Sequence, residues 1–330
     1  MTALVTGATG FVGSAVARKL LNRGESVRVM ARESSDKSNL DGLDVEIVTG
    51  DLTDKASLKA ACQGIDRLYH VAADYRLWTL DPKEMLKANV EGSQNIVLAA
   101  AEAGVTRMVY CSSVAVLGID PAPPHGTEDT PVTYANMIGP YKQSKFLAEE
   151  AVRDIIEKQG LDVVIVNPST PIGPRDIKPT PTGRMIVEAA SGKMPAYVDT
   201  GLNIAHVDDV AEGHLLAMDK GGTGERYILG GENMTLREIL TDIAGIVGRK
   251  PPKVRIPHNA ILPFAALAEG WARMTRGKEP FATLDGIKMA KKKMFFSAEK
   301  AKRELGYSPR PAHEALADAV DWFREKNYLR

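Results

Sequence analysis

The stretch LVTGATGFVG, residues 4–13, runs from apolar residues directly into three glycines. Glycine is favoured where the chain turns tightly or where a ligand must come close to the backbone. Gly7 permits the turn, Gly10 lets a pyrophosphate approach, and Gly13 lets the following helix pack on the preceding strand. The helix N-terminus adds unpaired N–H groups and the positive end of the helix dipole. The stretch therefore predicts a turn that binds a dinucleotide.

Strands and helices alternate on either side of this turn and far beyond it. The expected strands are residues 3–6, 26–31, 45–48, 67–71, 108–112 and 162–167, and the expected helices are residues 11–23, 55–62, 85–103 and 141–158. Such alternation is typical of right-handed βαβ units. We therefore predict an α/β fold with a doubly wound parallel sheet (Rossmann fold), with its ligand crevice beyond the carboxyl ends of the strands.

The pattern changes after Asn167. The segment NPSTPIGPRDIKPTPTG carries five prolines, so we expect an irregular functional loop over the crevice. The segment IAHVDDVAEGHLLAM predicts a loop and a helix that return to the main sheet. We assign residues 1–168 to a dinucleotide-binding Rossmann domain, with 203–229 returning to it, and residues 169–202 and 230–330 to a smaller, helix-rich C-terminal substrate-binding lobe.

Composition narrows the possible functions. The 330 residues include 42 Lys and Arg and 42 Asp and Glu, so the charge gives no reason to expect a nucleic acid partner. The two cysteines, Cys62 and Cys111, lack the spacing of a disulfide scaffold or a zinc cluster, and we expect no metal. No signal peptide and no membrane-spanning stretch is recognisable, so we expect a cytoplasmic protein.

The glycine spacing carries a resemblance to a known family. Gly-x-x-Gly-x-x-Gly, preceded by Thr6, resembles the extended branch of the short-chain dehydrogenase/reductase superfamily, which contains NAD-dependent epimerases and dehydratases. The resemblance implies a nicotinamide cofactor, and such a cofactor carries the hydride chemistry itself.

The end of the second strand bears on the choice of cofactor. An acidic residue there would bind the ribose 2′-hydroxyl of NAD, whereas an arginine suits the 2′-phosphate of NADP. Arg32, with Lys37 shortly after it, favours NADP, while Glu33 leaves NAD open. By resemblance, Asp51 and Leu52 in GDL belong to the adenine-contacting segment, although Asp51 is also suited to cap the following turn.

Tyr141 and Lys145 in YKQSK are four residues apart, which places both side chains on one face of the predicted helix. The pKa of a phenol is about 10, too high for an acid–base catalyst at neutral pH. A neighbouring ammonium favours the phenolate, so we expect Lys145 to lower the pKa of Tyr141 and also to reach the ribose of the cofactor.

A pair of serines completes the catalytic pattern that the resemblance implies. In VYCSSVAVLG the predicted strand ends at Ser112 and Ser113, and the second serine of the family's pair hydrogen-bonds the substrate oxygen. Matching Gly118 to the family's closing glycine puts that role on Ser113. Ser112 stays in reserve, because a slip of one residue would reverse the two side chains.

Several further positions match the family pattern. Asn89 matches a family asparagine, although a structural hydrogen bond explains it equally well, and we expect His70 to be a packed residue rather than an acid–base group. The resemblance implies cofactor contacts from Thr6, Gly7, Thr9, Gly10, Phe11, Val12, Gly13, Arg32, Lys37, Asp51, Leu52, Ala72, Ala73, Asn89, Tyr141, Lys145, Pro168 and Ser169.

Together with VAADYRLW and GPRDIKPTPTGR, these motifs resemble the hopanoid-associated sugar epimerase family, which is related to dihydroflavonol 4-reductases. Two activities compete: an epimerase or dehydratase that keeps NAD bound, and a reductase that uses NADPH. Arg32 favours the reductase, which would transfer hydride between nicotinamide and a carbonyl or carbinol carbon of a small or lipid-linked, hopanoid-pathway substrate. A dinucleotide sensor without catalysis is a third alternative, disfavoured by the intact Tyr141 and Lys145 pair.

Candidate substrate contacts follow from the crevice rule. They are Tyr75, Arg76 and Trp78 after the fourth strand, and Arg175, Lys178, Thr180 and Arg184 in the proline-rich segment. The basic members suit a phosphate or carboxylate, and ordinary solvation explains each of them equally well. By analogy with the family we expect a homodimer that pairs through the helix of Tyr141.

An apolar segment lies in the C-terminal part. Residues 260–274, AILPFAALAEGWARM, are followed by KMAKKK at 288–293, a combination that could dock on an anionic membrane. We favour the alternative, a helix packed on the core of its own lobe beside a solvated basic turn.

Overall fold

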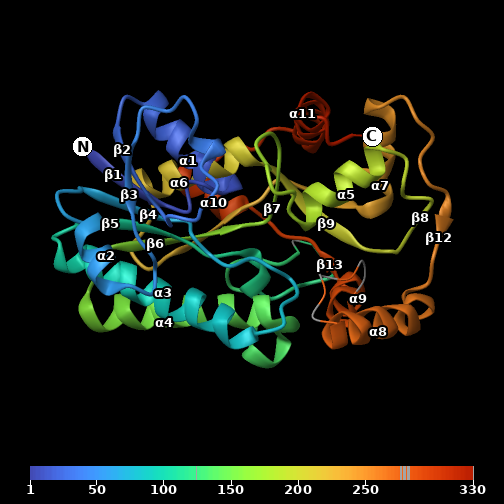
Figure 1. Cartoon of the computed structure of the whole chain (residues 1–330), viewed down its shortest axis with the longest axis horizontal. Helices are drawn as coiled ribbons and strands as arrows, with labels where there is room; N and C mark the ends of the chain where they lie inside the picture. Colours follow the sequence, from blue (N-terminus) through green and yellow to red (C-terminus); the bar gives the residue numbers. More distant parts are fainter. Residues whose placement is uncertain (124, 276, 278–279, 281–282, 330) are drawn as a thin grey trace.

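In the computed structural model, which describes all residues except 124, 276, 278–279, 281–282 and 330, a seven-stranded sheet forms the centre of the larger part of the molecule (Figure 1). The strands lie in the order β10-β6-β5-β4-β1-β2-β3, and each neighbouring pair is parallel. Their bounds are β1 (Thr2–Thr6), β2 (Ser26–Ala31), β3 (Glu46–Thr49), β4 (Arg67–His70), β5 (Arg107–Cys111), β6 (Val163–Pro168) and β10 (Arg226–Leu229). The predicted doubly wound parallel sheet is confirmed, and its order reverses between β1 and β4, where such sheets bind ligands.

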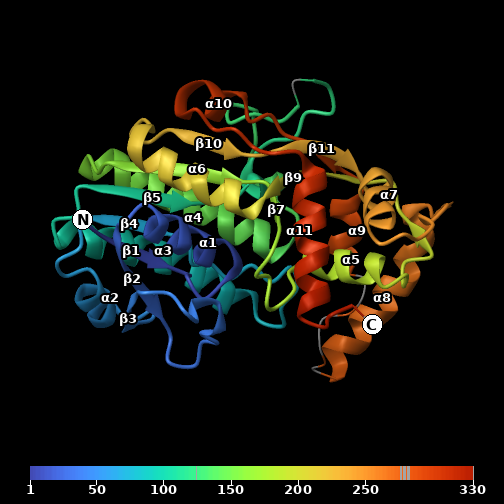
Figure 2. The ribbon, with the colours of Figure 1, turned by 90° about the horizontal axis from the view of Figure 1, so that it is seen from above.

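Helices cover both faces of this sheet (Figures 1 and 2). One face carries α1 (Phe11–Asn22) and α6 (Val207–Lys220), and the other carries α2 (Lys55–Ala61), α3 (Pro82–Glu102) and α4 (Gly139–Gln159). Side chains alternate along each strand, so Val5 joins the core under α1 and α6 while Leu4 joins the core on the opposite face. The central strands β1, β5 and β6 are buried on both faces and mostly apolar, which makes them recognisable in the sequence, whereas the edge strand β3 is largely exposed.

The smaller part of the molecule follows the carboxyl ends of β6 and β10. Its sheet contains β11 (Glu232–Thr235), β9 (Gly201–His206) and β13 (Lys293–Met294), with β7 (Thr170–Ile172) also paired to β9, and β8 (Ala196–Tyr197) pairs with β12 (Val254–Arg255). Its helices are α5 (Pro181–Ala190), α7 (Leu236–Ile246), α8 (His258–Thr275), α9 (Leu284–Ala290) and α11 (Ala312–Glu325). A separate core around Ile204, Ile239 and Phe323 holds α5, α7 and α11 on this sheet. The helix α10 (Glu299–Leu305) instead packs on α6 and β10.

The proline-rich segment is more regular than the sequence suggests. It contains the strand β7 and, from Pro181, the first turn of α5. Pro171 is tolerated because β7 is an edge strand, and Pro181 because the first turn of a helix needs no N–H donor. The expectation of an irregular loop is therefore wrong at both ends of the segment.

The return to the main sheet also begins later than predicted. Residues 203–206 belong to β9, which pairs with β7, β11 and β13 in the smaller sheet. The helix α6 that follows does pack on β5 and β6, and β10 then extends the main sheet. The division into a cofactor-binding domain and a substrate-binding lobe stays a prediction.

The glycine turn between β1 and α1 leaves no space for side chains. Gly7 has a φ of +74°, and a Cβ there would lie 2.7 Å from the backbone nitrogen of Ala72, in the segment after β4. A Cβ at Gly13 would overlap the carbonyl oxygen of Gly7. The turn, the start of α1 and the segment after β4 are therefore packed backbone against backbone.

We expect Gly13→Ala to lower the free energy of unfolding by about 1 to 3 kcal/mol, because the added methyl group must push the turn away from α1. The matched control is Gly245→Ala in α7, where the exposed glycine has no atom within 4 Å of an added Cβ. That change should stabilise the protein by up to about 1 kcal/mol. Chemical denaturation measures both variants, and equal effects at the two positions would contradict the packing described here.

Candidate active site

The segment that follows β4 is tied to the glycine turn through Thr6. The Thr6 hydroxyl accepts hydrogen bonds from the amides of Val71 and Ala72, each at 3.2 Å, and lies 2.7 Å from Nδ1 of His70. Thr6 is fully buried, so its side chain holds this segment in place and does not face a ligand. Ala72 and Ala73, both half-buried, are thereby placed beside Gly7.

His70 is a packed residue, as expected. Its Nε2 lies 3.2 Å from the hydroxyl of Ser93 on α3, and only 1 % of the residue is exposed. Burial, with a further contribution from the charge of Lys145, lowers the pKa of His70 to about 3. The ring is therefore neutral at physiological pH and is held between two hydroxyl groups.

The N-terminus of α1 is open to an anion. Gly10 is the N-cap and provides no side-chain cap, and the first turn carries no acidic residue. Thr9, Gly10, Phe11 and Val12 are only half-buried, so the first amides of the helix are close to the surface. Gly13 is buried beneath the turn. These features fit the pyrophosphate of a dinucleotide.

Asn39 supports this turn and was not recognised in the sequence. It is 97 % buried, and its Nδ2 lies 3.3 Å from the carbonyl oxygen of Thr9, 3.4 Å from that of Gly10 and 3.2 Å from that of Arg175. The amide thus links the glycine turn to the proline-rich segment. These partners are far away in the sequence, and no local motif indicates them.

A cavity of about 570 Å³ lies at the carboxyl ends of β2 and β3. It is lined by Arg32, Glu33, Ser34, Thr49, Gly50, Asp51, Asp54 and Ser57. Arg32 is exposed, and its charge contributes to a lowered pKa of Asp51, whose main cause is hydrogen bonding to Thr53. The cavity lies where a doubly wound sheet places the adenosine of a dinucleotide, and it offers a cation for a phosphate on the ribose.

The other residues predicted in this region have defined partners. The carboxylate of Asp51 accepts hydrogen bonds from the amide and hydroxyl of Thr53, so it closes a turn, while Asp54 caps α2. The side chain of Leu52 packs against Gly92 of α3. Lys37 is half-buried, and its Nζ donates to the carbonyl oxygen of Glu33 at 3.3 Å.

Tyr141, Ser113 and Lys145 are brought together between β5 and the start of α4. Ser113 follows β5, and its hydroxyl is close enough to the phenol of Tyr141 to favour the phenolate. Lys145, one helical turn after Tyr141, is 97 % buried, and its Nζ donates to the carbonyl oxygen of Cys111 at 3.0 Å. An ammonium has three donors, so two remain for other acceptors. Ribose hydroxyls of a nicotinamide cofactor would suit these donors.

The expected effect of Lys145 on Tyr141 is wrong for the protein without a ligand. Burial raises the pKa of Tyr141, and the nearby hydroxyl of Ser113 opposes this shift only in part. Burial also lowers the pKa of Lys145, whose ammonium is directed to the carbonyl group of Cys111. Desolvation of both groups therefore outweighs the attraction on which the sequence argument relied.

Buried residues hold Ser113 in place. Asn167, at the end of β6, donates from Nδ2 to the carbonyl oxygen of Ser113 at 3.1 Å and to the carboxylate of Glu149 at 2.9 Å. Glu149 is 98 % buried on α4. The reserve candidate, Ser112, has a buried hydroxyl without a hydrogen-bond partner among the described residues. Pro168 and Ser169 continue β6, and Ser169 donates its amide to the carbonyl oxygen of Leu229.

Asn89 joins the segment after β4 to α4. Its Oδ1 accepts a hydrogen bond from the amide of Asp74 at 2.7 Å, and its Nδ2 lies 2.9 Å from both the carbonyl oxygen of Asp74 and the hydroxyl of Ser144. Asn89 is 98 % buried. These bonds are structural, and they hold the segment that carries Tyr75, Arg76 and Trp78.

The predicted substrate residues lie in two groups. Tyr75 follows β4 and is partly exposed, and desolvation of its buried part raises the pKa of the phenol. The charges of Asp176 and Arg184 also act on this pKa, so the three groups lie near one another. Arg175 instead forms an ion pair with Asp208, and Lys178 lies 3.9 Å from Asp36. Arg175 and Lys178 thus lie beside the start of α6 and the segment after β2. The hydroxyl of Thr180 caps α5, and Arg76 pairs with Asp74.

Asp176 is an acidic residue of this region that the sequence argument missed. It is 97 % buried, and its carboxylate accepts hydrogen bonds from the amide and hydroxyl of Thr180. Burial raises the pKa of Asp176 to about 6, although the bonds from Thr180 and the charge of Arg184 oppose the shift. A buried acid beside exposed Tyr75 and Arg184 is a candidate substrate-binding feature.

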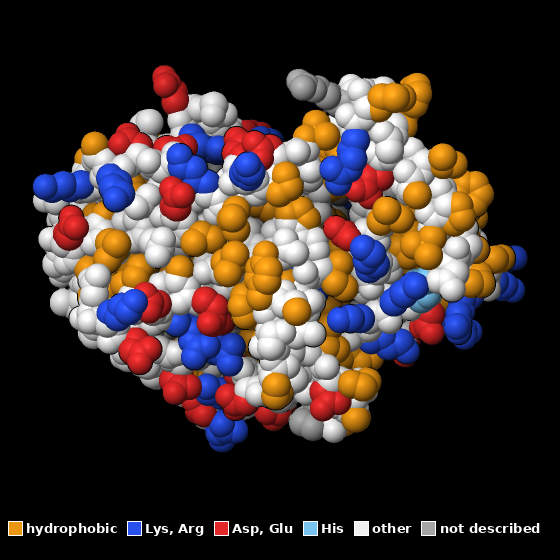
Figure 3. All heavy atoms as spheres, turned by 90° about the horizontal axis from the view of Figure 1, so that it is seen from below, with side chains coloured by type: hydrophobic (Ala, Val, Ile, Leu, Met, Phe, Trp, Pro, Cys, Tyr) orange, Lys and Arg blue, Asp and Glu red, His pale blue; other side chains and the backbone are white. Residues whose placement is uncertain are grey.

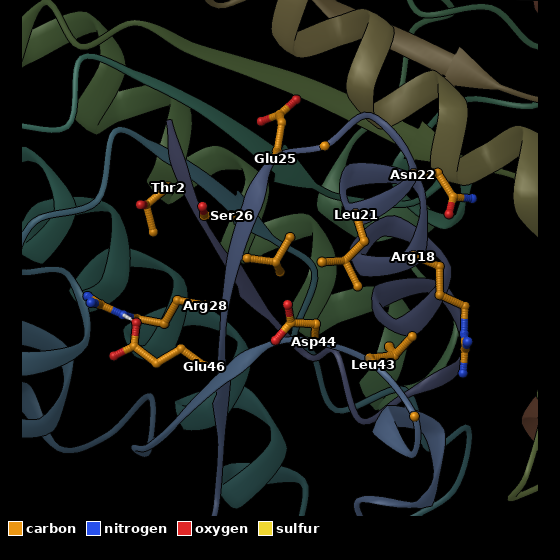
Figure 4. Close-up of a pocket in the computed structure, with 13 residues that line it drawn as sticks. Thr2, Arg18, Leu21, Asn22, Glu25, Ser26, Arg28, Leu43, Asp44 and Glu46 are labelled. Carbon is orange, nitrogen blue, oxygen red and sulfur yellow. Dashed lines mark hydrogen bonds and ion pairs between the residues drawn. The ribbon is translucent and has the colours of Figure 1, made fainter.

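A larger cavity, of about 740 Å³, lies elsewhere (Figure 4). It is bordered by α1, β2 and the segment before β3, and the ion pair between Arg28 and Glu46 crosses its edge. None of the predicted site residues lines it. Size alone therefore does not identify the functional site of this molecule.

Comparisons with known proteins agree with this geometry. Residues 3–230 match the NAD dependent epimerase/dehydratase family. A "Putative dihydroflavonol 4-reductase" of Synechocystis sp. is 45 % identical over 99 % of this chain and 95 % of the relative. Sterol demethylase protein B of Methylococcus capsulatus is 38 % identical over the full length of both. The crystal structure of gox2253 has 53 % identity and a TM-score of 0.90, covering 100 % of this chain and 99 % of the other.

We expect Asp176→Asn to gain stability relative to the wild type as the pH rises from 4 to 7. The unfolded carboxyl has a pKa of about 4, whereas the native pKa is about 6. Between these values the native state holds a proton that the unfolded state has released, so the wild type loses stability with rising pH. The variant lacks this titration. Its advantage should grow by about 2 kcal/mol between pH 4 and pH 7.

Chemical denaturation at pH 4, 5, 6 and 7 checks this expectation. Asp41→Asn is the control, because Asp41 is exposed. A constant difference between Asp176→Asn and the wild type across these pH values would contradict the assignment of a buried, protonated acid.

Proposed function

This chain belongs to the NAD dependent epimerase/dehydratase family, an extended branch of the short-chain dehydrogenases and reductases, and on that premise we propose that it is an NADPH-dependent reductase of a ketone or aldehyde in an apolar, lipid-like molecule. Membership makes the chain an NAD(P)-dependent enzyme. The arrangement of Ser113, Tyr141 and Lys145 is the observation that carries the proposal.

The choice of NADPH is supported by the cavity at the ends of β2 and β3. Arg32 lines this cavity and is exposed, so its guanidinium can bind a phosphate through two parallel hydrogen bonds. The carboxylate of Asp51 stays charged, and its hydrogen bonds from Thr53 tie it into a turn. Lys37 lies close by and adds positive charge.

Tyr141, Ser113 and Lys145 each have a separate role in the proposed reduction. A bound dihydronicotinamide supplies the hydride that adds to the carbonyl carbon. Tyr141 transfers its phenolic proton to the carbonyl oxygen, and the product is an alcohol. Burial raises the pKa of Tyr141, so the phenol keeps its proton at neutral pH, the state that reduction requires. The Ser113 hydroxyl orients the same oxygen, and Lys145 provides donors for the ribose and positive charge beside the phenolate that forms.

The proposed substrate class rests on the relatives. The names of two full-length relatives refer to a dihydroflavonol and to a sterol, both of which are polycyclic molecules without a nucleotide group. A ketone or aldehyde on a polycyclic or isoprenoid skeleton, such as that of the hopanoids, therefore fits better than a sugar nucleotide. The polar residues Tyr75, Asp176 and Arg184 would then bind a polar end of the substrate.

A nucleotide-sugar epimerase or dehydratase is the second candidate. Glu33 lines the same cavity as Arg32, and an acidic residue there suits the ribose hydroxyl of NAD. Such an enzyme would keep NAD bound through purification, and it would not consume NADPH.

We expect Tyr141→Phe to reduce turnover by roughly a hundredfold to ten-thousandfold, because the proton donor is lost, while NADPH binding is retained. The measurement is NADPH oxidation with a 3-ketosteroid and a dihydroflavonol as probes, together with NADPH affinity by fluorescence. Tyr134→Phe is the control, because Tyr134 is exposed before α4 and should leave turnover unchanged. Full activity in Tyr141→Phe would contradict the proposal.

We expect Arg32→Ser to weaken NADPH binding by roughly tenfold to a hundredfold, the worth of one charged hydrogen-bonding pair. The affinity for NADH should not change, because NADH has no phosphate on its ribose, so this affinity serves as the internal control. Equal losses for both cofactors, or a wild type that prefers NADH, would refute the role given to Arg32. Retained NAD in the purified wild type would favour the epimerase.

A further inference from the structure

The helix α8 exposes an apolar face to solvent. Phe264 is 73 % exposed, Leu267 74 %, Trp271 66 % and Met274 71 %. These positions recur every three or four residues, so their side chains form one stripe along the helix. Figure 3 shows hydrophobic side chains gathered on the right of the face seen from below, where Figure 1 places α8 and α9.

The opposite face of α8 is apolar as well. Ala265 and Ala272 are buried, and the helix packs on α9. The expectation that residues 260–274 pack on the core of their own lobe therefore holds for one face of the helix and is wrong for the other. A helix with apolar residues on an exposed face as well as on its buried face is unusual unless the exposed face has a partner.

The surroundings of α8 are strongly basic. Residues 250–294 contain ten Lys and Arg and three Asp and Glu, an excess of seven positive charges in a chain whose net charge is zero. Exposed cations in this region are Lys253, Arg255, Lys288, Lys291, Lys292 and Lys293. Asp199 and Asp285 pair with three of them, Arg255, Lys293 and Lys288, and leave the region with net positive charge. Figure 3 shows Lys and Arg side chains beside the hydrophobic ones.

This surface adjoins the candidate active site. A Cβ at Gly139, the first residue of α4, would lie 3.3 Å from the carboxylate of Asp285 on α9. Burial acts to raise the pKa of Glu269 of α8, but hydrogen bonds from Arg273 and from the amide of Leu284 lower it. Trp78, in the segment after β4, is close enough to Glu269 to contribute to the same lowering. Both α4 and the segment after β4 line the proposed substrate site.

We propose that the exposed face of α8 docks on an anionic lipid bilayer. Phe264, Leu267, Trp271 and Met274 would enter the boundary between headgroups and acyl chains, and the lysines of α9 and β13 would attract the headgroups. Aromatic and aliphatic side chains beside lysines are typical of helices that lie in the membrane surface. Among the helices of the described residues, none is both long and apolar enough to span a bilayer, which is consistent with docking from one side.

The position of the surface also suggests a source of substrate. If the proposed function is correct, on which this step rests, a bilayer under α8 would bring its lipids close to the segment after β4 and the start of α4. An apolar ketone could then enter the site from the membrane without crossing water.

Flotation of the full-length protein with vesicles tests the docking. We expect binding to vesicles of equal parts phosphatidylglycerol and phosphatidylcholine, and much weaker binding to phosphatidylcholine alone or at high salt. The double substitution Leu267→Ser and Trp271→Ser should reduce binding by at least roughly tenfold. The matched control is Ile47→Ser, because Ile47 is 46 % exposed on β3 in the other part of the molecule.

Two further measurements separate the possible outcomes. NADPH affinity should be the same in all variants. Loss of vesicle binding with intact NADPH binding would therefore locate the effect on α8. Absence of NADPH binding in the wild type would overturn the proposed function but not the docking. Sedimentation velocity reports the oligomeric state. A wild type that does not bind the vesicles would overturn the docking. A wild type that forms a dimer which the double substitution splits would also overturn it, and would assign the face to a second copy of the chain.

If the double variant fails to fold, quenching of wild-type tryptophan fluorescence by brominated lipid replaces it. The substitution Trp271→Phe should abolish most of the quenching while vesicle binding persists. Quenching that is unchanged in Trp271→Phe would place the contact elsewhere and overturn the proposal.

Discussion

The candidate site depends on the close contact between the glycine turn and the segment after β4. Gly7 and Ala72 touch backbone to backbone, and the Thr6 hydroxyl accepts hydrogen bonds from the amides of Val71 and Ala72. Any side chain at Gly7 or Gly13 would separate these elements. The contact brings the N-terminus of α1, where a pyrophosphate can bind, next to the segment that leads to Tyr75 and Trp78. Cofactor and substrate positions are therefore fixed by one arrangement of backbone.

A second set of contacts, all of them buried, places the reactive side chains. Asn167, itself bound to Glu149, holds the carbonyl group of Ser113, while the carbonyl group of Cys111 holds the ammonium of Lys145. Asn89 connects the segment after β4 to Ser144 on the same helix as Tyr141. Leaving these donors unpaired inside the protein would be costly, and their hydrogen bonds together hold the site in place.

The sequence predicts what is local and misses what depends on distant partners. The glycine turn, the strands of the main sheet and the spacing of Tyr141 and Lys145 are visible because a few neighbouring residues determine each of them. Asn39 and Asp176 have no such signal, since their roles arise from contacts with other segments and from burial. The effect of Lys145 on Tyr141 was misjudged because desolvation depends on the folded surroundings. The sequence leaves both alternatives for residues 260–274 open, because an apolar pattern does not show which side of a helix meets solvent.

The central claim is that the glycine turn and α4 hold a nicotinamide ring opposite the phenol of Tyr141. A crystal structure of the protein with NADP⁺ tests it most directly. We expect the pyrophosphate at the amides of Phe11 and Val12, the ribose of the nicotinamide at Lys145, and C4 of the ring facing the Tyr141 hydroxyl across a gap that one carbonyl group fills. A dinucleotide bound elsewhere, or a ring turned away from Tyr141, would contradict the account.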